Sequence, residues 1–352
     1  MIWQGLQVAQ VRTARLSIIV LLAGVAFAPR AAAQGLTFSL FERYLDTLRE
    51  QALIPGLSAA IVQDGDVVWD HGFGMARLES FVPATAITPY PIGDLSQTFA
   101  STLLLQRCVD DGHLTLGDRV LRWLPLYSEP QTTVSQLLRH ISTSGSFSYS
   151  PTRYATVTDV VEECARGDYP LILTNFVLDR LAMIDSVPGE DLGTSSTLFT
   201  KAKRERYQDI LSKIASSYRI DRGRAVRSDY RLKLLSAANG IVSSARDLAK
   251  YDAALDDDDL LSPGTKALAW TASTGVPTGL GWFVQRYNGE LIVWHMGYSK
   301  DAYSSLIIKV PARHLTMILL ANSDGLGSST ILSDGDVTKS LFATLFLRLA
   351  VP

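Results

Sequence analysis

Apolar and polar residues alternate in strand-like runs at both ends of the chain. The runs 57–63 and 67–73 flank Asp64-Gly65, a dipeptide that is typical of a two-residue β-hairpin turn. Asn288-Gly289 marks a second hairpin, and a Pro-Ala-Arg turn separates two more strand-like runs near the C-terminus. We therefore expect antiparallel strands from both ends of the sequence.

Between these strands, apolar residues recur at the three- and four-residue spacing of helices that are buried on one face. This spacing predicts helices at 38–53, 100–111, 134–140, 154–165, 243–255 and 337–349. The order predicts an α+β fold, in which an antiparallel sheet is flanked by helices and carries an inserted, mainly helical lobe. We place the sheet lobe at about 36–93 and 236–352, and the helical lobe at about 94–235.

One predicted helix begins at Asp94 and carries Gln97 one turn later. Asp-x-x-Gln at a helix start is close to a capping box, in which the carboxylate accepts backbone N–H bonds and the amide reaches back. The positive end of the helix dipole would also hold the Asp94 carboxylate ionised. The pattern by itself therefore predicts a well-capped helix in the core, ending before Gly112.

The first 33 residues have the features of an export signal. Arg12 and Arg15 precede the apolar run 16–28, and Ala31-Ala32-Ala33 offers a cleavage site. We expect cleavage near Ala33, a mature domain over 34–352, and export to a periplasm or out of the cell. No later stretch is long and apolar enough for a transmembrane helix.

Charge and composition exclude several classes of function. The formal net charge is −2, and no basic stripe is interleaved with aromatic residues, so we expect no nucleic-acid partner. The segment 201–233 is locally basic, with eleven Lys or Arg against four Asp or Glu. We interpret it as a solvated helical face, with contact to an acidic polymer as the alternative. No cluster of Cys, His and carboxylates has metal-ligand spacing, so we expect no metal and no cofactor.

The two cysteines, Cys108 and Cys164, both lie on apolar helical patterns. A buried free thiol behaves as a small hydrophobic group, and we favour this state for both residues. A disulfide between them is the alternative in an oxidising compartment.

Several segments, taken in order, resemble the serine β-lactamase and penicillin-binding-protein superfamily, and in particular its class C-related, esterase-like branch. The segments that carry the resemblance are Ile54–Ala60, Gly72–Gly74, Ile92-Gly93 before Thr98-Phe99, Leu137–His140, Tyr149-Ser150, Asn239–Leu248, Gly279–Trp282 and Ala321-Asn322. The resemblance covers about residues 38–349 and implies the β-lactamase/DD-peptidase-like fold.

The resemblance implies a Ser-x-x-Lys pair where this chain has Asp94 and Gln97. In the family, the serine is acylated and the lysine helps to remove its proton. The first lysine of this chain is Lys201, so no shift of register restores the pair. A glutamine amide cannot accept that proton, and acylation of a carboxylate would give an unstable anhydride. The implied oxyanion hole consists of the backbone N–H groups of Asp94 and Tyr298.

The other family motifs are closer to the expected pattern. Tyr149 matches the tyrosine of a Tyr-x-Asn motif, whereas Pro151 stands in place of the asparagine beyond Ser150. His295 and Gly297 match the His-x-Gly form of the Lys-Thr-Gly strand motif. Without the resemblance, a single tyrosine before a helix and a single histidine on a strand would be interpreted as core residues.

Three functions remain open from the sequence. The first is an exported family member that has lost acyl transfer and binds a small molecule, a peptide or a protein partner in the cleft. The second is an active hydrolase of esters, amides or cell-wall-type peptides, with Tyr149 as base and His295 assisting. Its nucleophile would then be Ser96, Ser150 or water. The third is a structural protein whose cleft is filled by side chains.

Overall fold

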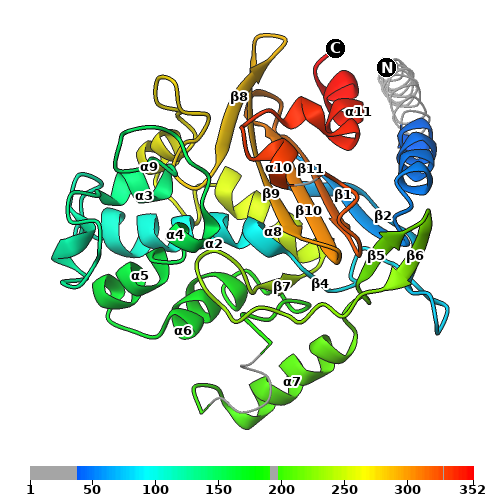
Figure 1. Cartoon of the computed structure of the whole chain (residues 1–352), viewed down its shortest axis with the longest axis horizontal. Helices are drawn as coiled ribbons and strands as arrows, with labels where there is room; N and C mark the ends of the chain where they lie inside the picture. Colours follow the sequence, from blue (N-terminus) through cyan, green and yellow to red (C-terminus); the bar gives the residue numbers. More distant parts are fainter. Residues whose placement is uncertain (1–37, 191–196, 328) are drawn as a thin grey trace, which may run out of the picture. The chain divides into compact units, whose positions relative to one another are not determined.

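The computed structural model describes residues 38–190, 197–327 and 329–352 (Figure 1). The predicted export signal lies outside the described residues. The first helix, predicted at 38–53, is observed at 38–51. This helix crosses the boundary between an N-terminal unit, which ends at Thr47, and the main unit, Leu48–Pro352.

The main unit is built on a seven-stranded antiparallel sheet with the strand order β3-β2-β1-β11-β10-β9-β8. Its strands are β1 (Gly56–Gln63), β2 (Asp66–Arg77), β3 (Val82–Pro83), β8 (Phe283–Tyr287), β9 (Glu290–Ser299), β10 (Tyr303–Val310) and β11 (Leu315–Ala321). β1 pairs with β11, in a register that places Leu57 opposite Ala321. Strands from the two ends of the sequence therefore meet within one sheet, as predicted.

Both predicted hairpins are confirmed. Asp64 and Gly65 have φ values of 52° and 82°, and Asn288 and Gly289 have φ values of 47° and 83°. Two successive left-handed residues define the turn whose twist matches that of the flanking strands. The dipeptides Asp-Gly and Asn-Gly form this turn readily because glycine and asparagine tolerate positive φ.

Helices and two small sheets make up the rest of the main unit. The α-helices are α2 (Ser96–Leu104), α3 (Val134–Leu138), α4 (Pro151–Tyr154), α5 (Val157–Ala165), α6 (Tyr169–Leu173), α7 (Lys201–Ser212), α8 (Ala245–Asp256), α9 (Pro263–Ala269), α10 (Ser329–Leu332) and α11 (Leu341–Ala350). Short helical turns are η1 (Gly93–Leu95), η2 (Leu105–Asp110), η3 (Val120–Arg122), η4 (Thr174–Leu178), η6 (Pro311–Arg313) and η7 (Val337–Lys339). β4 (Tyr90–Pro91) pairs with β7 (Val242–Ser243), and β5 (Tyr218–Asp221) pairs with β6 (Arg224–Arg227). None of the helices in the described ranges is long and apolar enough to span a membrane.

The central helix α2 is fully buried and joins the sheet to the helical part of the unit. Phe99 on α2 stacks on Tyr251 of α8 with 4.0 Å between the ring centroids. α8 in turn packs on β1, β2 and β11. One hydrophobic core thus runs from the sheet through α8 to α2, and it fixes the position of the turn that precedes α2.

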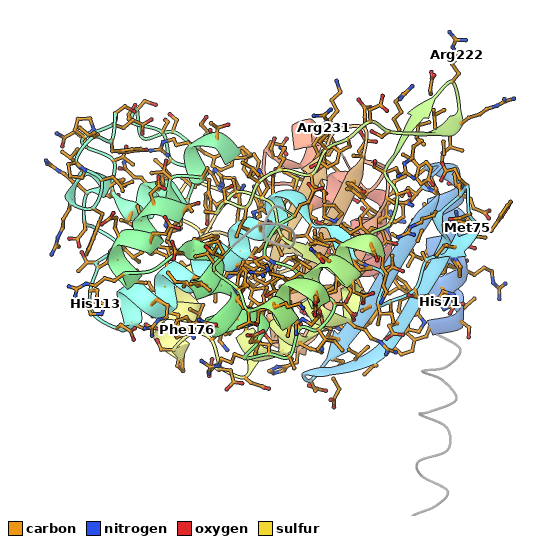
Figure 2. All side chains as sticks on the ribbon, turned by 90° about the horizontal axis from the view of Figure 1, so that it is seen from below. His71, Met75, His113, Phe176, Arg222 and Arg231 are labelled. Carbon is orange, nitrogen blue, oxygen red and sulfur yellow. A yellow bond between two sulfur atoms is a disulfide. The ribbon has the colours of Figure 1, made fainter. Side chains whose placement is uncertain are left out.

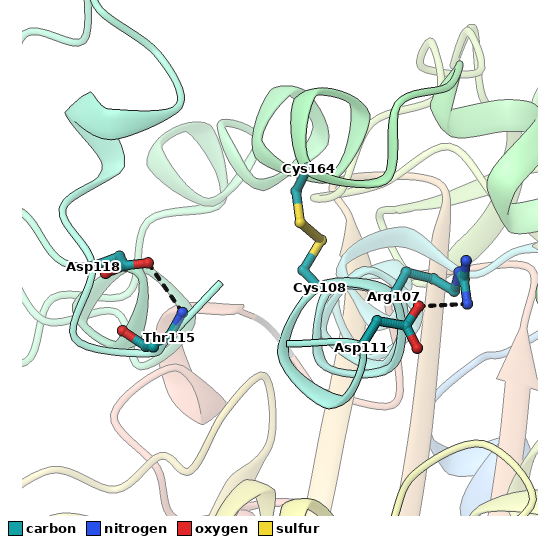
Figure 3. Close-up of a disulfide and its surroundings, with 6 residues drawn as sticks. All are labelled: Arg107, Cys108, Asp111, Thr115, Asp118 and Cys164. Atoms are coloured by element: carbon teal, nitrogen blue, oxygen red, sulfur yellow. Dashed lines mark hydrogen bonds and ion pairs between the residues drawn. A yellow bond between two sulfur atoms is a disulfide. The ribbon is translucent and has the colours of Figure 1, made fainter. Parts of the chain in front are cut away.

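The expectation of two free thiols is wrong. Cys108 in η2 and Cys164 in α5 form a disulfide, with 5.9 Å between the Cα atoms (Figure 3). The prediction that both side chains are buried is correct. The apolar face of each helical segment packs against the other, and this contact brings the two sulfur atoms together.

Candidate functional site

The turn at Asp94 differs from the capped helix start that its sequence predicts. Residues 93–95 form the 3₁₀ turn η1, and α2 begins only at Ser96, with Leu95 as its N-cap. No side chain caps either segment. The capping-box prediction is therefore wrong, because both of its side chains bond to polar groups from distant parts of the chain.

Gln97 lies at the centre of a buried hydrogen-bond network. Its side-chain Oε1 accepts a bond from His140 Nε2 at 2.8 Å, and its Nε2 donates to the hydroxyl of Tyr149 at 3.2 Å. The Tyr149 hydroxyl donates in turn to Asp94 Oδ2 at 3.2 Å. The residue that the resemblance places at the lysine position of the family is thus a neutral amide, both ends of which are bonded.

His140 has a fixed and uncharged ring. Its Nε2 carries the proton that is donated to Gln97, and its Nδ1 accepts a bond from the backbone N–H of Ser150 at 3.1 Å. Burial lowers the pKa of His140 to about 3, and the nearby His295 and Arg153 contribute to this lowering. The imidazole therefore stays neutral at physiological pH and positions Gln97.

Burial also controls the protonation of the Asp94 carboxyl group. Only 5% of the residue is exposed, and desolvation raises its pKa to about 7. The positive charge of Lys233 and the hydrogen bond from Tyr149 oppose this rise only in part. The expectation that the helix dipole holds this carboxylate ionised is therefore wrong, because the cost of desolvation outweighs the interaction with the dipole.

Tyr149 is a hydrogen-bond donor in this site and is poorly suited to act as a base. Burial raises its pKa well above the ordinary tyrosine value, and the neighbouring Asp94 adds to the rise. The residues that follow have structural roles: Ser150 caps α4 by accepting a bond from the Arg153 N–H at 3.2 Å, and Pro151 is the first residue of that helix. Proline is well suited to this position because its fixed φ is helical and no N–H is needed there.

The end of β9 lies directly against the Asp94 turn. A Cβ atom at Gly297 would overlap the carbonyl oxygen of Ile92, which also accepts a bond from the Ser305 hydroxyl at 2.8 Å. A Cβ atom at Gly93 would lie 2.9 Å from the backbone nitrogen of Tyr298. The two segments that carry the implied oxyanion-hole N–H groups are therefore neighbours.

His295 lies on the same face of β9 as Gly297, because alternate residues of a strand point to one side. Its Nδ1 donates to the carbonyl oxygen of Met296 at 2.7 Å, and burial lowers its pKa to about 4. Phe283 contacts the rings of both His295 and Tyr149, with centroid distances of 5.5 and 5.6 Å. His295 thus adds an uncharged ring to the site at neutral pH.

The structure brings Asp94, Gln97 and Tyr149 into direct contact, and it adds two residues that the sequence did not single out. His140 belongs to the Leu137–His140 segment that carried the resemblance, so its motif was a usable signal. Lys233 comes from an irregular loop that is far from α2 in the sequence, and no local sequence pattern connects it with Asp94. In the described ranges, no three His, Cys, Asp or Glu side chains gather as ligands for a metal ion.

Comparison with known proteins supports the fold and the family resemblance. A protein-family model described as "Beta-lactamase" matches residues 41–334. The putative penicillin-binding protein PbpX of Bacillus subtilis (strain 168) is 23% identical over 257 residues, which cover 64% of this chain and 61% of PbpX. The chain spans about three fifths of the length of the curated relatives that it matches.

Two solved structures show the same fold. The octameric penicillin-binding protein homologue from Pyrococcus abyssi has a TM-score of 0.72 and 21% identity, covering 89% of this chain and 77% of that chain. The D-amino acid amidase from Ochrobactrum anthropi SV3, complexed with L-phenylalanine amide, has a TM-score of 0.69 and 18% identity. That match covers 89% of this chain and 99% of the amidase chain.

Proposed function

We propose, because the chain belongs to the beta-lactamase family over residues 41–334, that it keeps the family cleft as a ligand-binding site and forms no acyl-enzyme. The observation that carries this proposal is the network from Asp94 through Tyr149 and Gln97 to His140. Every member of this network uses its polar group to bond to another member. Acyl transfer by this family needs a basic nitrogen beside a hydroxyl nucleophile, and the network does not contain that arrangement.

The chemistry of the two exchanged residues supports loss of acylation. Gln97 has no basic lone pair, so it cannot take a proton from a nucleophile or return one to a leaving group. A carboxylate at position 94 would form an anhydride with an acyl group. The same carboxylate lies next to its own backbone N–H, the group that would have to stabilise an oxyanion.

The ligand class that we propose is an uncharged amide or peptide. His140, His295 and Tyr149 are all neutral at physiological pH, so these side chains offer aromatic faces to a ligand and no positive charge for an anion. Two structural relatives are described as a penicillin-binding protein homologue and a D-amino acid amidase, and both names refer to molecules with amide bonds. A protein partner presenting a peptide segment fits the same chemistry.

We further propose that the protein is exported. Its N-terminal 33 residues have the composition of a signal peptide, and the disulfide between Cys108 and Cys164 is of a kind that persists in oxidising compartments.

Intact-mass spectrometry after incubation with benzylpenicillin and 4-nitrophenyl acetate tests the loss of acylation. We expect no adduct on the natural protein. The variant Asp94→Ser/Gln97→Lys is the matched control, because it restores the Ser-x-x-Lys pair within the same cleft. An adduct of the natural protein that disappears in Asp94→Asn would contradict the proposal.

One observation favours a second function, in which Asp94 activates water. A carboxyl group with a pKa of about 7 is half ionised at neutral pH, which suits a general base. Tyr149, the base in the hydrolase hypothesis from the sequence, is less suitable because its pKa is raised. D-phenylalanine amide distinguishes the two functions: a binding protein gives a heat of binding without release of ammonia. Ammonia release that is abolished by Asp94→Asn would establish the hydrolase.

A further inference from the structure

A pocket lies beside the small sheet of β5 and β6. Its volume is about 380 Å³, and none of Asp94, Gln97, Tyr149 or His295 contributes to its wall. The lining comes from β2, from the end of α7 and the segment before β5, from β6 and the segment after it, and from β10. These lining residues are Arg77, Leu211, Ser212, Ile214–Ser217, Arg227, Ser228, Tyr230, Leu232 and Tyr303.

Arg77 places a positive charge on one wall of this pocket. Its Nε donates to the carbonyl oxygen of Ile214 at 3.3 Å, and its Nη2 donates to the carbonyl oxygens of Ser212 and Ile214. Across the described ranges, no carboxylate forms an ion pair with this guanidinium group. The side chain is therefore held in position by neutral acceptors, and its charge is uncompensated.

Arg227 supplies a second guanidinium group from β6. Its Nη1 donates to the hydroxyl of Ser216 and lies 3.6 Å from Glu79 Oε2. Both side chains of this ion pair are more than half exposed, so the pair contributes little to stability and can open at little cost. Within the described residues, Glu79 is the one carboxylate at ion-pair distance from Arg227.

The other walls combine hydroxyl groups with aromatic rings. Ser216 and Ser217 are buried and line the pocket. Tyr230 and Tyr303 meet edge to face, with 5.5 Å between the ring centroids, and Leu232 extends this apolar surface. A lining that combines two guanidinium groups, hydroxyls and aromatic rings matches a molecule that has one anionic end and a small apolar body.

We propose that this pocket binds a small organic oxyanion, a carboxylate or phosphate attached to a ring or a short apolar group, through Arg77 and Arg227. Arginine suits this role because its planar N–H groups bind two oxygens of one anion at once. The pocket size accommodates a small ligand of this kind. The pocket neighbours the Asp94 site, because burial and the charge of Asp94 raise the pKa of the lining residue Tyr230, but no residue of the Asp94 network lines it. The proposal does not depend on the function proposed for the Asp94 site.

Calorimetric titration of the full chain at pH 7 with phenyl phosphate, benzoate and inorganic phosphate tests the proposal. We expect at least one of the two organic anions to bind, more tightly than inorganic phosphate because the rings add apolar contact. Arg227→Gln should weaken that binding at least tenfold, and Arg77→Gln should do the same if its thermal unfolding remains cooperative. The preferred organic anion then identifies the ligand as a phosphate or a carboxylate.

Two matched controls separate the pocket from other anion sites. Arg222 extends from the tip of the β5–β6 hairpin (Figure 2) and lies outside the pocket lining, so Arg222→Gln removes the same charge from the same hairpin. Tyr149→Phe alters the hydrogen-bond network at Asp94. Neither variant should change the affinity. Equal weakening by Arg222→Gln would point to a general basic surface for acidic polymers, and loss in Tyr149→Phe would place the anion in the cleft; either result overturns the proposal.

Glu79 provides a test in the opposite direction. Because its carboxylate competes with the ligand for Arg227, Glu79→Gln should tighten binding of the organic anion about threefold or more. No binding of either organic anion by the natural protein at millimolar concentration would also overturn the proposal. So would an unchanged affinity in Arg227→Gln.

Discussion

Asp94 shows how burial alone can reverse an expectation about a single residue. Its carboxyl group sits close to a helix start, where a helix dipole favours a negative charge by about 0.3–1 kcal/mol. Desolvation acts in the opposite direction and is larger, so the pKa rises to about 7. Exposure cannot be read from the four-residue pattern Asp-x-x-Gln, so the pattern could not predict this raised pKa.

The raised pKa of Asp94 predicts a stability that falls with rising pH. Between the ordinary aspartate pKa near 4 and the folded-state pKa near 7, the folded protein binds more protons than the unfolded chain. The free energy of unfolding therefore decreases across this window as pH rises, and the loss is complete above it. Asp94→Asn removes the titration while it keeps an acceptor for Tyr149. We expect this variant to match the natural protein near pH 4 and to exceed it at pH 8 by as much as about 4 kcal/mol.

Urea unfolding at several pH values measures this difference. Asp66→Asn is the control, because Asp66 is exposed at the start of β2, and its pH profile should follow that of the natural protein. If Asp94→Asn also follows the natural profile from pH 4 to pH 8, the carboxyl group titrates normally and the argument for its burial fails.

The same residues show how far sequence can predict a site. The resemblance pointed to Asp94, Gln97 and Tyr149 through local motifs, and the structure brings these three side chains into contact. The contacts between them and their partners could not be predicted in this way. The motif Leu137–His140 marked His140, but only the fold places its Nε2 at 2.8 Å from the amide of Gln97, 43 residues away along the chain. A capping box is recognised from four neighbouring residues alone. That interpretation was wrong because Asp94 and Gln97 bond to Tyr149 and His140, which are distant in the sequence.

At the scale of elements, the hairpin turns were predicted because two adjacent residues decide them. Gly289 has a φ of 83°, and a Cβ atom added there would meet no other atom within 4 Å, so any cost of a side chain comes from the backbone alone. We expect Gly289→Ala to lower the free energy of unfolding by about 1–2 kcal/mol. Gly117 is equally open but does not have a left-handed φ, so Gly117→Ala should be neutral or slightly stabilising in the same thermal-unfolding assay.

The sequence could not show whether Cys108 and Cys164 form a disulfide, because each cysteine fits an apolar helical face whether or not it is oxidised. The bridge closes a sequence separation of 56 residues, for which the chain-entropy relation gives a stabilisation of about 4 kcal/mol. We expect a reductant, or the variant Cys108→Ala/Cys164→Ala, to lower the midpoint of urea unfolding accordingly. The double variant should no longer respond to the reductant. If the reductant also leaves the urea midpoint of the natural protein unchanged, and mass spectrometry finds both thiols free, the two cysteines are buried thiols and the disulfide is absent.

At the scale of the whole main unit, the sheet joins sequence segments that are more than 200 residues apart. The sequence predicted this arrangement because strand-like runs occur at both ends and helical runs lie between them. It could not predict which charged residues the arrangement buries. Lys309 of β10 is fully buried against α8, where its Nζ lies 2.5 Å from Asp252 Oδ1 and 3.0 Å from Asp256 Oδ1.

This ion pair predicts a strongly non-additive pair of substitutions. Lys309→Met leaves Asp252, which is completely buried, without its cation, and we expect a loss of about 3–5 kcal/mol in the free energy of unfolding. Lys309→Met/Asp252→Leu removes both charges and fills the space with apolar groups, so it should recover most of that loss. A double-mutant cycle by urea unfolding gives the coupling energy directly. A double variant as unstable as Lys309→Met would mean that Asp256 carries the interaction, because its carboxylate would then be the group left without a partner.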